Sequence, residues 1–395
     1  MLDAMPEIPT TTMKHGPRDK DATPLLTRAR ALAPSLPSYR AEHDLHKQLA
    51  PPVANALRDG GFLCCLAPRE VGGSELSVRE YLEVVEAIGL GDSAAAWCVM
   101  TAATSALVTT YLPRATTEEL WREFPPFLAG IFAPGGKLVP DADGKSYRLT
   151  GRWSYASGSR HADWFVVGAI HDKRHLICVL PASQVTVIDN WNTIGLAGTG
   201  SHDIIVEGAT IPADRVSSMF ERRSWSNAPL YRVPVFGLLS CGIAAVALGI
   251  AGAALERAAT EMIASCPPPS PGTPHPSPPS SSLARYASCR AQLDAARAYL
   301  HSTATVIQAH ATEAKVDPVT RADFRLAATY VSQQCAEVTR AALHLTGGTA
   351  IRADHPIGAA LRDIETLCTH KMVTDRGLPA FSRAILGLGP VAPEL

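Results

Sequence analysis

The spacing of apolar residues changes twice along this chain of 395 residues. From about Pro24 to Pro113 apolar residues recur at helical spacing, and the same spacing returns from about Pro234. Between Phe127 and Pro212 stand six short β-rich runs, separated by Gly, Pro, Asp and Asn. Six strands in under a hundred residues favour a small sandwich or barrel over a parallel sheet with crossover helices. We therefore predict an α+β fold with an N-terminal α-helical domain, a central small β-sandwich or barrel, and a C-terminal four-helix bundle.

The same changes of spacing give the boundaries of the parts. The first segment contains Asp3 and Glu7 and lacks an apolar core, so it does not read as a secretory signal. Residues 266–282, CPPPSPGTPHPSPPSSS, are predicted to form a loop because proline breaks regular structure. The predicted parts are a disordered lead-in (1–22), a helical domain (23–125), a β-domain (126–232) and a helical bundle (233–395).

Composition excludes several functional classes. The formal net charge of −1 and a pI near 6.9 give no basic footprint for nucleic acid or an anionic membrane. The nine cysteines have no CxxC spacing, so we expect reduced thiols in a cytoplasmic protein and no metal site. Val235–Leu255 has 21 residues without a charge, but ten of them are Ala or Gly rather than large apolar residues. A helix buried inside the bundle explains this stretch better than a membrane span.

The segment from Gly151 to Gly158 carries the most distinctive chemistry. It places an indole and a phenol among small residues, two of them glycines. Small residues allow close backbone approach, aromatic rings offer flat surfaces, and the Ser157 hydroxyl can hydrogen-bond a polar edge. Such a segment suits a planar heterocycle lying against a strand. It also fits an ordinary strand and turn with Trp153 in the core.

Four stretches, in this order along the chain, resemble the acyl-CoA dehydrogenase superfamily. They read FLCCLAPREVGGSELSVREYLEVVEAIGLGDSAAAW, GRWSYASGSRHADWF, GTGSHDIIVEGATIPADRV and LTGGTAIRADHPIGAALRD. Within the superfamily, Gly151-x-Trp153-x-x-x-Ser157-Gly158 followed by HADW at 161–164 resembles the reduced-flavin-dependent two-component monooxygenases. The resemblance implies an acyl-CoA dehydrogenase-like fold whose C-terminal bundle builds a homotetramer.

A local feature near the C-terminus separates monooxygenases from dehydrogenases. Many dehydrogenases of the superfamily place a catalytic glutamate eight residues after the Asp of an Arg-Asp pair. Here the pair is Arg362-Asp363, and the corresponding position holds Lys371, preceded by His370. An ammonium is not a base at neutral pH, whereas an imidazole can accept or donate a proton. Glu256 or Glu261 could supply the base from an earlier helix, so an acyl-CoA dehydrogenase or oxidase with FAD stays an alternative.

The cofactor is expected to be reduced FMN, with FAD possible. By the resemblance, the loop 266–282 lies where dehydrogenases carry Arg and Phe contacts to the adenine half of FAD, and it offers no such pair. The sequence also has no strand–GxGxxG–helix unit for a nicotinamide, so a separate flavin reductase is implied. The implied reaction uses O₂ and a C4a-hydroperoxyflavin to hydroxylate or N-oxidise a small, secondary-metabolite substrate. A non-redox binding or cyclising protein on the same fold is the remaining alternative.

The resemblance assigns roles to individual residues. Ser157 would hydrogen-bond flavin N5, and His370 would be the catalytic acid–base group. Gly347 and Gly348 would approach the flavin phosphate of a neighbouring subunit. The other expected contacts to the flavin are Trp153, Gly158, Phe132, Thr199 and Ser201.

One departure from the resemblance concerns the substrate. Members that hydroxylate phenols place a histidine in the apolar helix after Ala96-Trp97, and that position here holds Ser105. Phenol hydroxylation is therefore not implied for this chain. Ser105 and Tyr111 are the expected hydrogen-bonding partners of a polar substrate.

Overall fold

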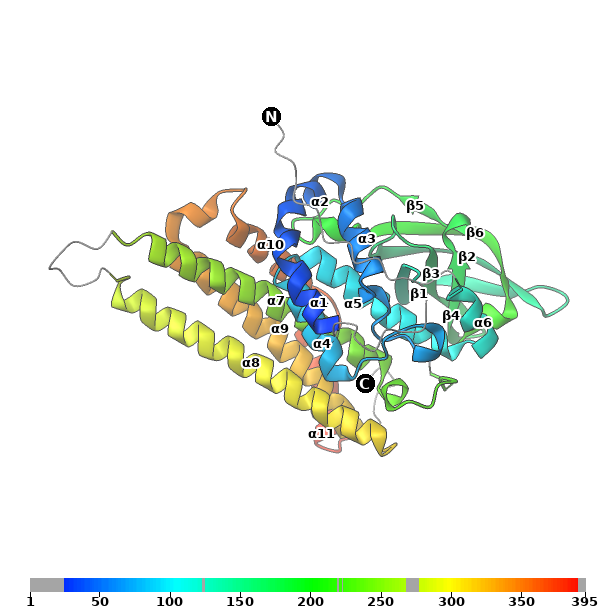
Figure 1. The fold of residues 1–395 in the computed structure, drawn as a ribbon. Coiled ribbons are helices and arrows are strands. Elements are labelled where there is room, and N and C mark those ends of the chain that lie inside the picture. The colour runs from blue at the N-terminus through cyan, green and yellow to red at the C-terminus, as the bar shows by residue number, and fades with distance from the viewer. Residues whose placement is uncertain (1–24, 123–124, 219, 222, 268–276, 390–395) are drawn as a thin grey trace.

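The computed structural model describes residues 25–122, 125–218, 220–221, 223–267 and 277–389. The predicted lead-in, 1–22, lies outside this part of the chain. Figure 1 shows short N-terminal helices in the middle of the molecule, a curved sheet on one side and a stack of long helices on the other. The order helices, strands, helices confirms the prediction of an α+β chain with a C-terminal bundle.

The N-terminal helices begin where the sequence supplies caps. Ser77 caps α4 through a capping box with Glu80, and the Asp92 carboxylate accepts from the Ala95 N–H at the start of α5. Pro51 begins α3, because proline lacks the N–H that a first helical turn leaves unpaired. The helices of this part are α1 Leu25–Leu32, α2 Arg40–His46, α3 Pro51–Asp59, α4 Val78–Gly89, α5 Ser93–Val108 and α6 Arg114–Leu120.

Seven strands form one continuous sheet in the order β5-β6-β2-β1-β3-β4-β7. Neighbouring strands are antiparallel except β1 and β3, which are parallel. One face of the sheet encloses its own core, which includes Leu149, Phe165 and Ile204, and the other face packs Val166 and Val179 against the helical core. The central strands are therefore buried on both faces. The strands are β1 Leu128–Pro140, β2 Ser146–Ala156, β3 Trp164–His171, β4 Arg174–Pro181, β5 Thr186–Ile188, β6 His202–Pro212 and β7 Val216–Ser217.

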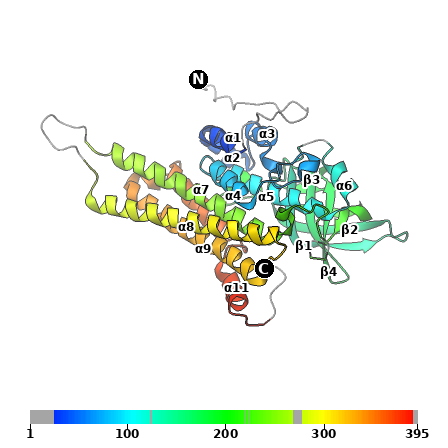
Figure 2. The same ribbon diagram turned by 60° about the horizontal axis from the view of Figure 1, so that its bottom comes forward.

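The C-terminal helices are α7 Val235–Ala264, α8 Ser280–Thr312, α9 Pro318–Thr346, α10 Pro356–Cys368 and α11 Leu378–Ile385. Figure 2 shows α7, α8 and α9 running side by side away from the sheet. The predicted loop is shorter than expected, because α8 already begins at Ser280, after Pro279. Residues 268–276 of that loop lie outside the described residues.

Two helices, Ser93–Tyr111 and Val235–Ala264, are long and apolar enough to cross a membrane. Both are enclosed by the protein itself, with 94% and 89% of their most apolar windows buried. The composition of α7 reflects close packing: a Cβ on Gly249 would lie 2.6 Å from the Gly89 Cα of α4. The prediction of a helix buried within the bundle is confirmed.

Candidate active site

A cavity of about 900 Å³ lies where the three parts of the chain meet. Its walls come from α5, from β1 and β2, from the 191–201 segment, from the start of α7 and from the residues at and after the end of α10. This volume falls at the upper end of the range for small-molecule sites. Aromatic side chains supply much of the wall: Trp97, Phe132, Tyr155, Trp191, Phe220 and Phe236.

Helix α5 presents one stripe of side chains to the cavity. Trp97, Thr101 and Thr104 recur at helical spacing and therefore lie on one face. Both threonine hydroxyls are bonded to carbonyls of α5 itself. This polar stripe in an otherwise apolar helix was the sequence signal that could have identified the wall.

The two residues expected to hold the substrate do not line the cavity. The Ser105 hydroxyl donates to the Thr101 carbonyl at 2.7 Å and lies behind Gly130, where an added Cβ would come within 2.1 Å of it. Tyr111 follows the end of α5, is 8% exposed, and burial raises its pKa to about 12. Ser105 therefore faces away from this cavity, because each additional helical residue turns the side chain by about 100°, and Tyr111 lies beyond the end of the helix.

A chain of short hydrogen bonds joins three of the residues expected at the cofactor. The Trp97 indole N–H donates to Ser157 Oγ at 2.9 Å. Ser157 Oγ and Ser201 Oγ are 2.7 Å apart, and Ser201 Oγ and Thr199 Oγ1 are also 2.7 Å apart. Thr199 then donates to the Leu196 carbonyl at 2.8 Å. We refer to Trp97, Ser157, Ser201, Thr199 and Leu196 as the hydroxyl chain. All five line the cavity.

The indole of Trp153, by contrast, belongs to the core of the sheet. Its N–H donates to the Gly168 carbonyl at 2.7 Å, and the side chain is 2% exposed. The pairing of β2 with β6 shifts between Trp153 and Ala156, and this bulge turns Tyr155 toward the cavity with φ +70°. Trp153 therefore does not line this cavity. Tyr155, which the sequence reading missed, presents its ring there instead.

The remaining expected cofactor residues have different surroundings. Phe132 lines the cavity and contacts Phe236 edge to face, with ring centroids 6.5 Å apart. Gly158 adopts φ +73°, and its N–H donates to the Thr199 carbonyl at 2.7 Å, so it shapes the turn behind the hydroxyl chain rather than the wall. Gly347 and Gly348 are exposed at the end of α9, away from this cavity. Their role toward a neighbouring subunit stays a prediction.

His370 faces the cavity from the turn after α10. Its Nδ1 accepts from the Met372 N–H at 3.3 Å, so Nε2 carries the proton of the neutral ring. Burial, together with the charges of Lys371 and Arg325, lowers the pKa of His370 to about 4. The expectation of a group that titrates near neutral pH is therefore not met. His370 is a neutral hydrogen-bond donor at working pH.

This low pKa predicts a pH dependence of stability. The unfolded chain binds the proton near pH 6.5 and the folded chain only near pH 4, so lowering the pH through this window favours unfolding. The expected contribution is roughly 3 kcal/mol, lost as the pH falls from 6.5 to 4 and fully present above 6.5. We expect His370→Gln to reduce the fall in the urea midpoint between pH 7.5 and 5. The exposed His344→Gln is the control, and an equal fall in all three proteins would contradict the prediction.

The cavity lacks the base of a dehydrogenase. Among its described lining residues none is Asp or Glu, and Lys371 is the only lysine or arginine. Glu256 is exposed on α7, and Glu261 pairs with Arg257 and His355 outside the cavity. The site therefore suits chemistry that needs aromatic walls, hydroxyl groups and a neutral imidazole, rather than abstraction of a proton by a carboxylate.

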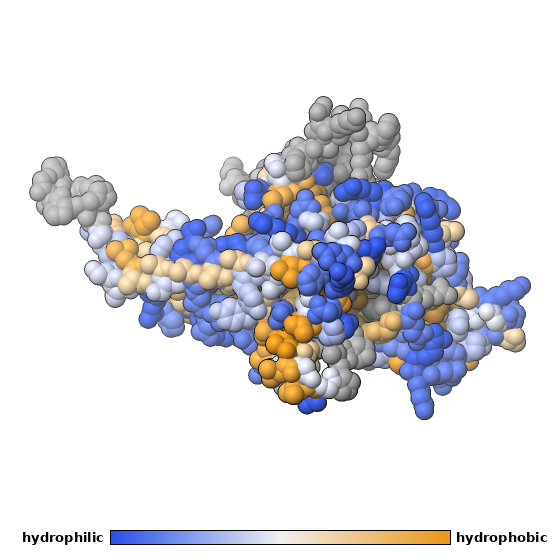
Figure 3. Space-filling view, turned by 90° about the horizontal axis from the view of Figure 1, so that it is seen from below, coloured by the Kyte–Doolittle hydropathy of each residue, from blue (hydrophilic) through white to orange (hydrophobic). Residues whose placement is uncertain are grey.

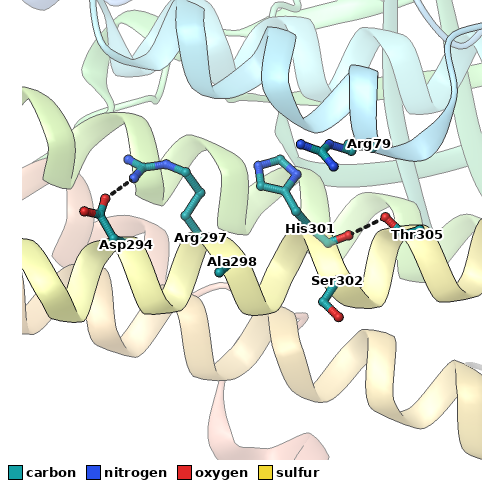
Figure 4. Close-up of a pocket in the computed structure, with 7 residues that line it drawn as sticks. All are labelled: Arg79, Asp294, Arg297, Ala298, His301, Ser302 and Thr305. Carbon is teal, nitrogen blue, oxygen red and sulfur yellow. Dashed lines mark hydrogen bonds and ion pairs between the residues drawn. The ribbon is translucent and has the colours of Figure 1, made fainter.

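A second hollow of about 410 Å³ lies between α4 and α8 (Figure 4). Its cations already have partners. Arg297 bonds Glu86 and Asp294, each at 2.7 Å, and Arg79 bonds Glu83 at 2.9 Å. These pairings leave this hollow without a charge to recognise a ligand.

Comparison with known proteins agrees with this geometry. The model of the acyl-CoA dehydrogenase N-terminal domain matches residues 25–130, and that of the C-terminal domain matches residues 241–375. Indole-3-acetate monooxygenase of Pseudomonas putida is 29% identical and covers 85% of this chain and 86% of that protein. The oxygenase subunit HsaA, a flavin-dependent monooxygenase of Mycobacterium tuberculosis, is 27% identical over 55% of this chain and 58% of its own length.

Two solved structures share the fold over nearly the whole chain. XiaF from Streptomyces, in complex with FADH2 and glycerol, has a TM-score of 0.86 at 24% identity and covers 94% of this chain and 97% of its own. The 3-HSA hydroxylase of Rhodococcus also has a TM-score of 0.86, at 21% identity, and covers 95% of this chain and 100% of its own. The chain therefore belongs to the acyl-CoA dehydrogenase superfamily, and the Pseudomonas putida and Mycobacterium tuberculosis relatives described above are named as monooxygenases.

Proposed function

We propose that this chain is the oxygenase component of a two-component flavin-dependent monooxygenase that hydroxylates or N-oxidises a small aromatic substrate. Reduced flavin comes from a separate reductase. In the reaction, one atom of O₂ enters the substrate, the other leaves as water, and reduced flavin is oxidised. The observation that carries the proposal is the 900 Å³ cavity, in which the hydroxyl chain and the neutral His370 occur together without any described carboxylate.

The residues of the cavity fit a flavin ring. Ser157 keeps a hydrogen-bonding position free toward the cavity, and Tyr155, 71% exposed, offers a flat face beside it. When bound, reduced flavin supplies the two electrons and the reactivity toward O₂. The protein then has to hold the ring, exclude water and orient the substrate. Phe132, Phe220 and Phe236 form the apolar wall that excludes water.

The substrate is proposed to be flat and to carry an acidic group. The aromatic walls favour a planar apolar body, and the exposed Lys371 is the one lysine or arginine among the described lining residues. An ammonium at the edge of an apolar cavity favours an anionic substituent. The named activity of the Pseudomonas putida relative, toward indole-3-acetate, makes that acid the first compound to test.

The proposal is tested by reconstitution. Purified protein, reduced FMN or reduced FAD and O₂ are combined with indole-3-acetate, indole-3-acetamide, indole or resorcinol. An oxygenated product, formed in preference from the acid, supports the proposal. If every compound gives only H₂O₂ with both flavins, and reduced flavin does not bind, the alternative of a non-redox protein on this fold is favoured. Bleaching of bound oxidised FAD by an acyl thioester without oxygen would instead identify a dehydrogenase.

Ser157→Ala should uncouple the reaction. The substitution removes a hydrogen bond to the ring, worth about 1 kcal/mol, and leaves the Trp97 N–H without its acceptor. We expect the share of O₂ released as H₂O₂ to rise about 5–10-fold, and the free energy of unfolding to fall by about 1–3 kcal/mol because the buried Trp97 donor loses its acceptor. The measurement is H₂O₂ per reduced flavin consumed, and Ser154→Ala, at a serine of β2 that lines the same cavity, is the control. Equal H₂O₂ release from the two variants would remove Ser157 from this role.

We further propose that the enzyme is a cytoplasmic homotetramer. Apolar side chains are exposed together at α11 and beyond it, at Ile385, Leu386 and Leu388, and Figure 3 shows this patch at the lower edge of the molecule. Patches of this kind mark protein–protein contacts. A mass by light scattering four times that of the chain supports the tetramer. A neighbouring subunit would also explain how Gly347 and Gly348 could contribute to a flavin site.

A further inference from the structure

The hydroxyl chain has a fixed direction, which follows from counting its protons. Ser157, Ser201 and Thr199 carry one hydroxyl proton each, and three short contacts join them to each other and to the Leu196 carbonyl. A carbonyl only accepts, so Thr199 uses its proton on Leu196. The contact between Ser201 and Thr199 then requires the proton of Ser201, and the contact between Ser157 and Ser201 requires the proton of Ser157.

The Trp97 end of the hydroxyl chain agrees with this direction. The Trp97 indole N–H is a donor only, and it occupies one lone pair of Ser157 Oγ at 2.9 Å. Ser157 thus donates to Ser201, accepts from Trp97 and has one lone pair left. All three hydroxyl residues are at most 5% exposed, so no bulk water competes for these bonds. The group that Ser157 presents to the cavity is an acceptor without a proton to give.

We infer that Ser201 and Thr199 are positioning residues that make the site select reduced over oxidised flavin. The inference rests on the proposed function. Position N5 of the flavin ring carries a proton when the flavin is reduced, and it is a bare acceptor when the flavin is oxidised. Because Ser157 can only accept, it can hydrogen-bond the N5–H of reduced flavin. It has no proton to donate to the bare N5 of oxidised flavin. The same preference keeps oxidised flavin from occupying the site after turnover.

The preference for reduced over oxidised flavin can be estimated from the hydrogen bond that Ser157 must break to bind oxidised flavin. To donate to a bare N5, Ser157 must give up its bond to Ser201, which leaves a buried hydroxyl contact without a proton. One such neutral bond is worth about 0.5–1.5 kcal/mol, which is about a 2–10-fold difference in affinity. A variant in which the hydroxyl chain no longer has a fixed direction should therefore show a roughly 2–10-fold smaller ratio of affinity for reduced flavin to affinity for oxidised flavin.

Two substitutions release the proton of Ser157 by different routes. In Ser201→Ala the acceptor of that proton is removed. In Thr199→Val, Ser201 loses its own acceptor and becomes free to donate to Ser157. Thr101→Val is the matched control, since Thr101 lines the same cavity but bonds only to carbonyls of α5. None of these changes removes Ser157 itself.

The experiment measures the dissociation constants of oxidised FMN and of dithionite-reduced FMN without oxygen, by titration of the folded proteins. We expect both variants to lower the preference for reduced FMN about 2–10-fold, mainly by tighter binding of oxidised FMN, with Thr101→Val unchanged. For a two-electron couple, a tenfold change appears as a fall of about 30 mV in the potential of the bound flavin. An unchanged ratio in a folded variant that binds both forms overturns the inference. Absence of binding of either form to the unaltered protein refutes the proposed function instead.

Discussion

Replacing Asp363 with alanine is expected to lower the free energy of unfolding by about 3–5 kcal/mol, because it leaves the buried donors of Ser93 and Leu196 without an acceptor and removes one of the two carboxylate partners of Arg40. The Asp363 side chain, on α10, is 1% exposed. Its carboxylate accepts from the Arg40 guanidinium at 2.5 and 3.1 Å, from Ser93 Oγ at 2.5 Å and from the Leu196 N–H at 2.7 Å. These donors come from α2, from α5 and from the segment that leads into the hydroxyl chain. One carboxylate thus ties the helical bundle to both other parts.

Removing the Asp363 carboxylate should also affect the active site. Leu196 adopts φ +53°, a conformation that a branched side chain disfavours, and its N–H is held by Asp363. Its carbonyl is the terminal acceptor of the hydroxyl chain. Without Asp363 we expect weaker binding of reduced FMN as well as a lower urea midpoint. Asp354→Ala, at an exposed carboxylate paired with Arg352 at 3.5 Å, is the matched control. A loss below 1 kcal/mol in Asp363→Ala would show that the Ser93 hydroxyl and the Leu196 N–H find other acceptors.

Local signals in the sequence were sufficient for the order of the parts and for many element boundaries. The capping box of Ser77 and Glu80 marks the start of α4, and Pro51 and Pro356 mark the starts of α3 and α10. These features depend only on neighbours along the chain. The low charge and the Ala and Gly content of α7 likewise predicted its burial, since small uncharged residues allow other helices to pack closely against it.

The contents of the site depended on geometry that no local pattern encodes. A bulge in β2 decides that Tyr155 rather than Trp153 faces the cavity, and a bulge is not visible in the alternation of residues. The rotation of α5 decides that Thr101 and Thr104 line the wall while Ser105 does not. Asp363 was read together with Arg362, but its partner, Arg40, is 323 residues away. Ser157, Thr199 and Ser201 were found through a family resemblance, and their connection to one another was found only in the structure.

Replacing His370 with alanine is expected to lower kcat for the oxygenation by about 10²–10³, the usual effect of removing one hydrogen-bond donor to developing negative charge. Oxidation of reduced flavin without substrate should continue. The reason is the tautomer: the Met372 N–H occupies Nδ1, so Nε2–H is the group available to a substrate oxygen or to the oxygen atom that departs. The Trp97 ring, 5.7 Å away and edge to face, limits the orientation of the imidazole.

The pH profile separates this role from general acid–base catalysis. A base with an ordinary imidazole pKa would lose activity as the pH falls through 6.5. His370, with its pKa lowered to about 4, stays neutral well below that value, so kcat should remain flat between pH 8 and 5.5. The measurement is kcat against pH for the unaltered protein, for His370→Gln and for the exposed His344→Gln as control. An acid limb near pH 6.5 that disappears only in His370→Gln would mean that the bound substrate restores an ordinary pKa. His370 would then accept a proton rather than donate a hydrogen bond.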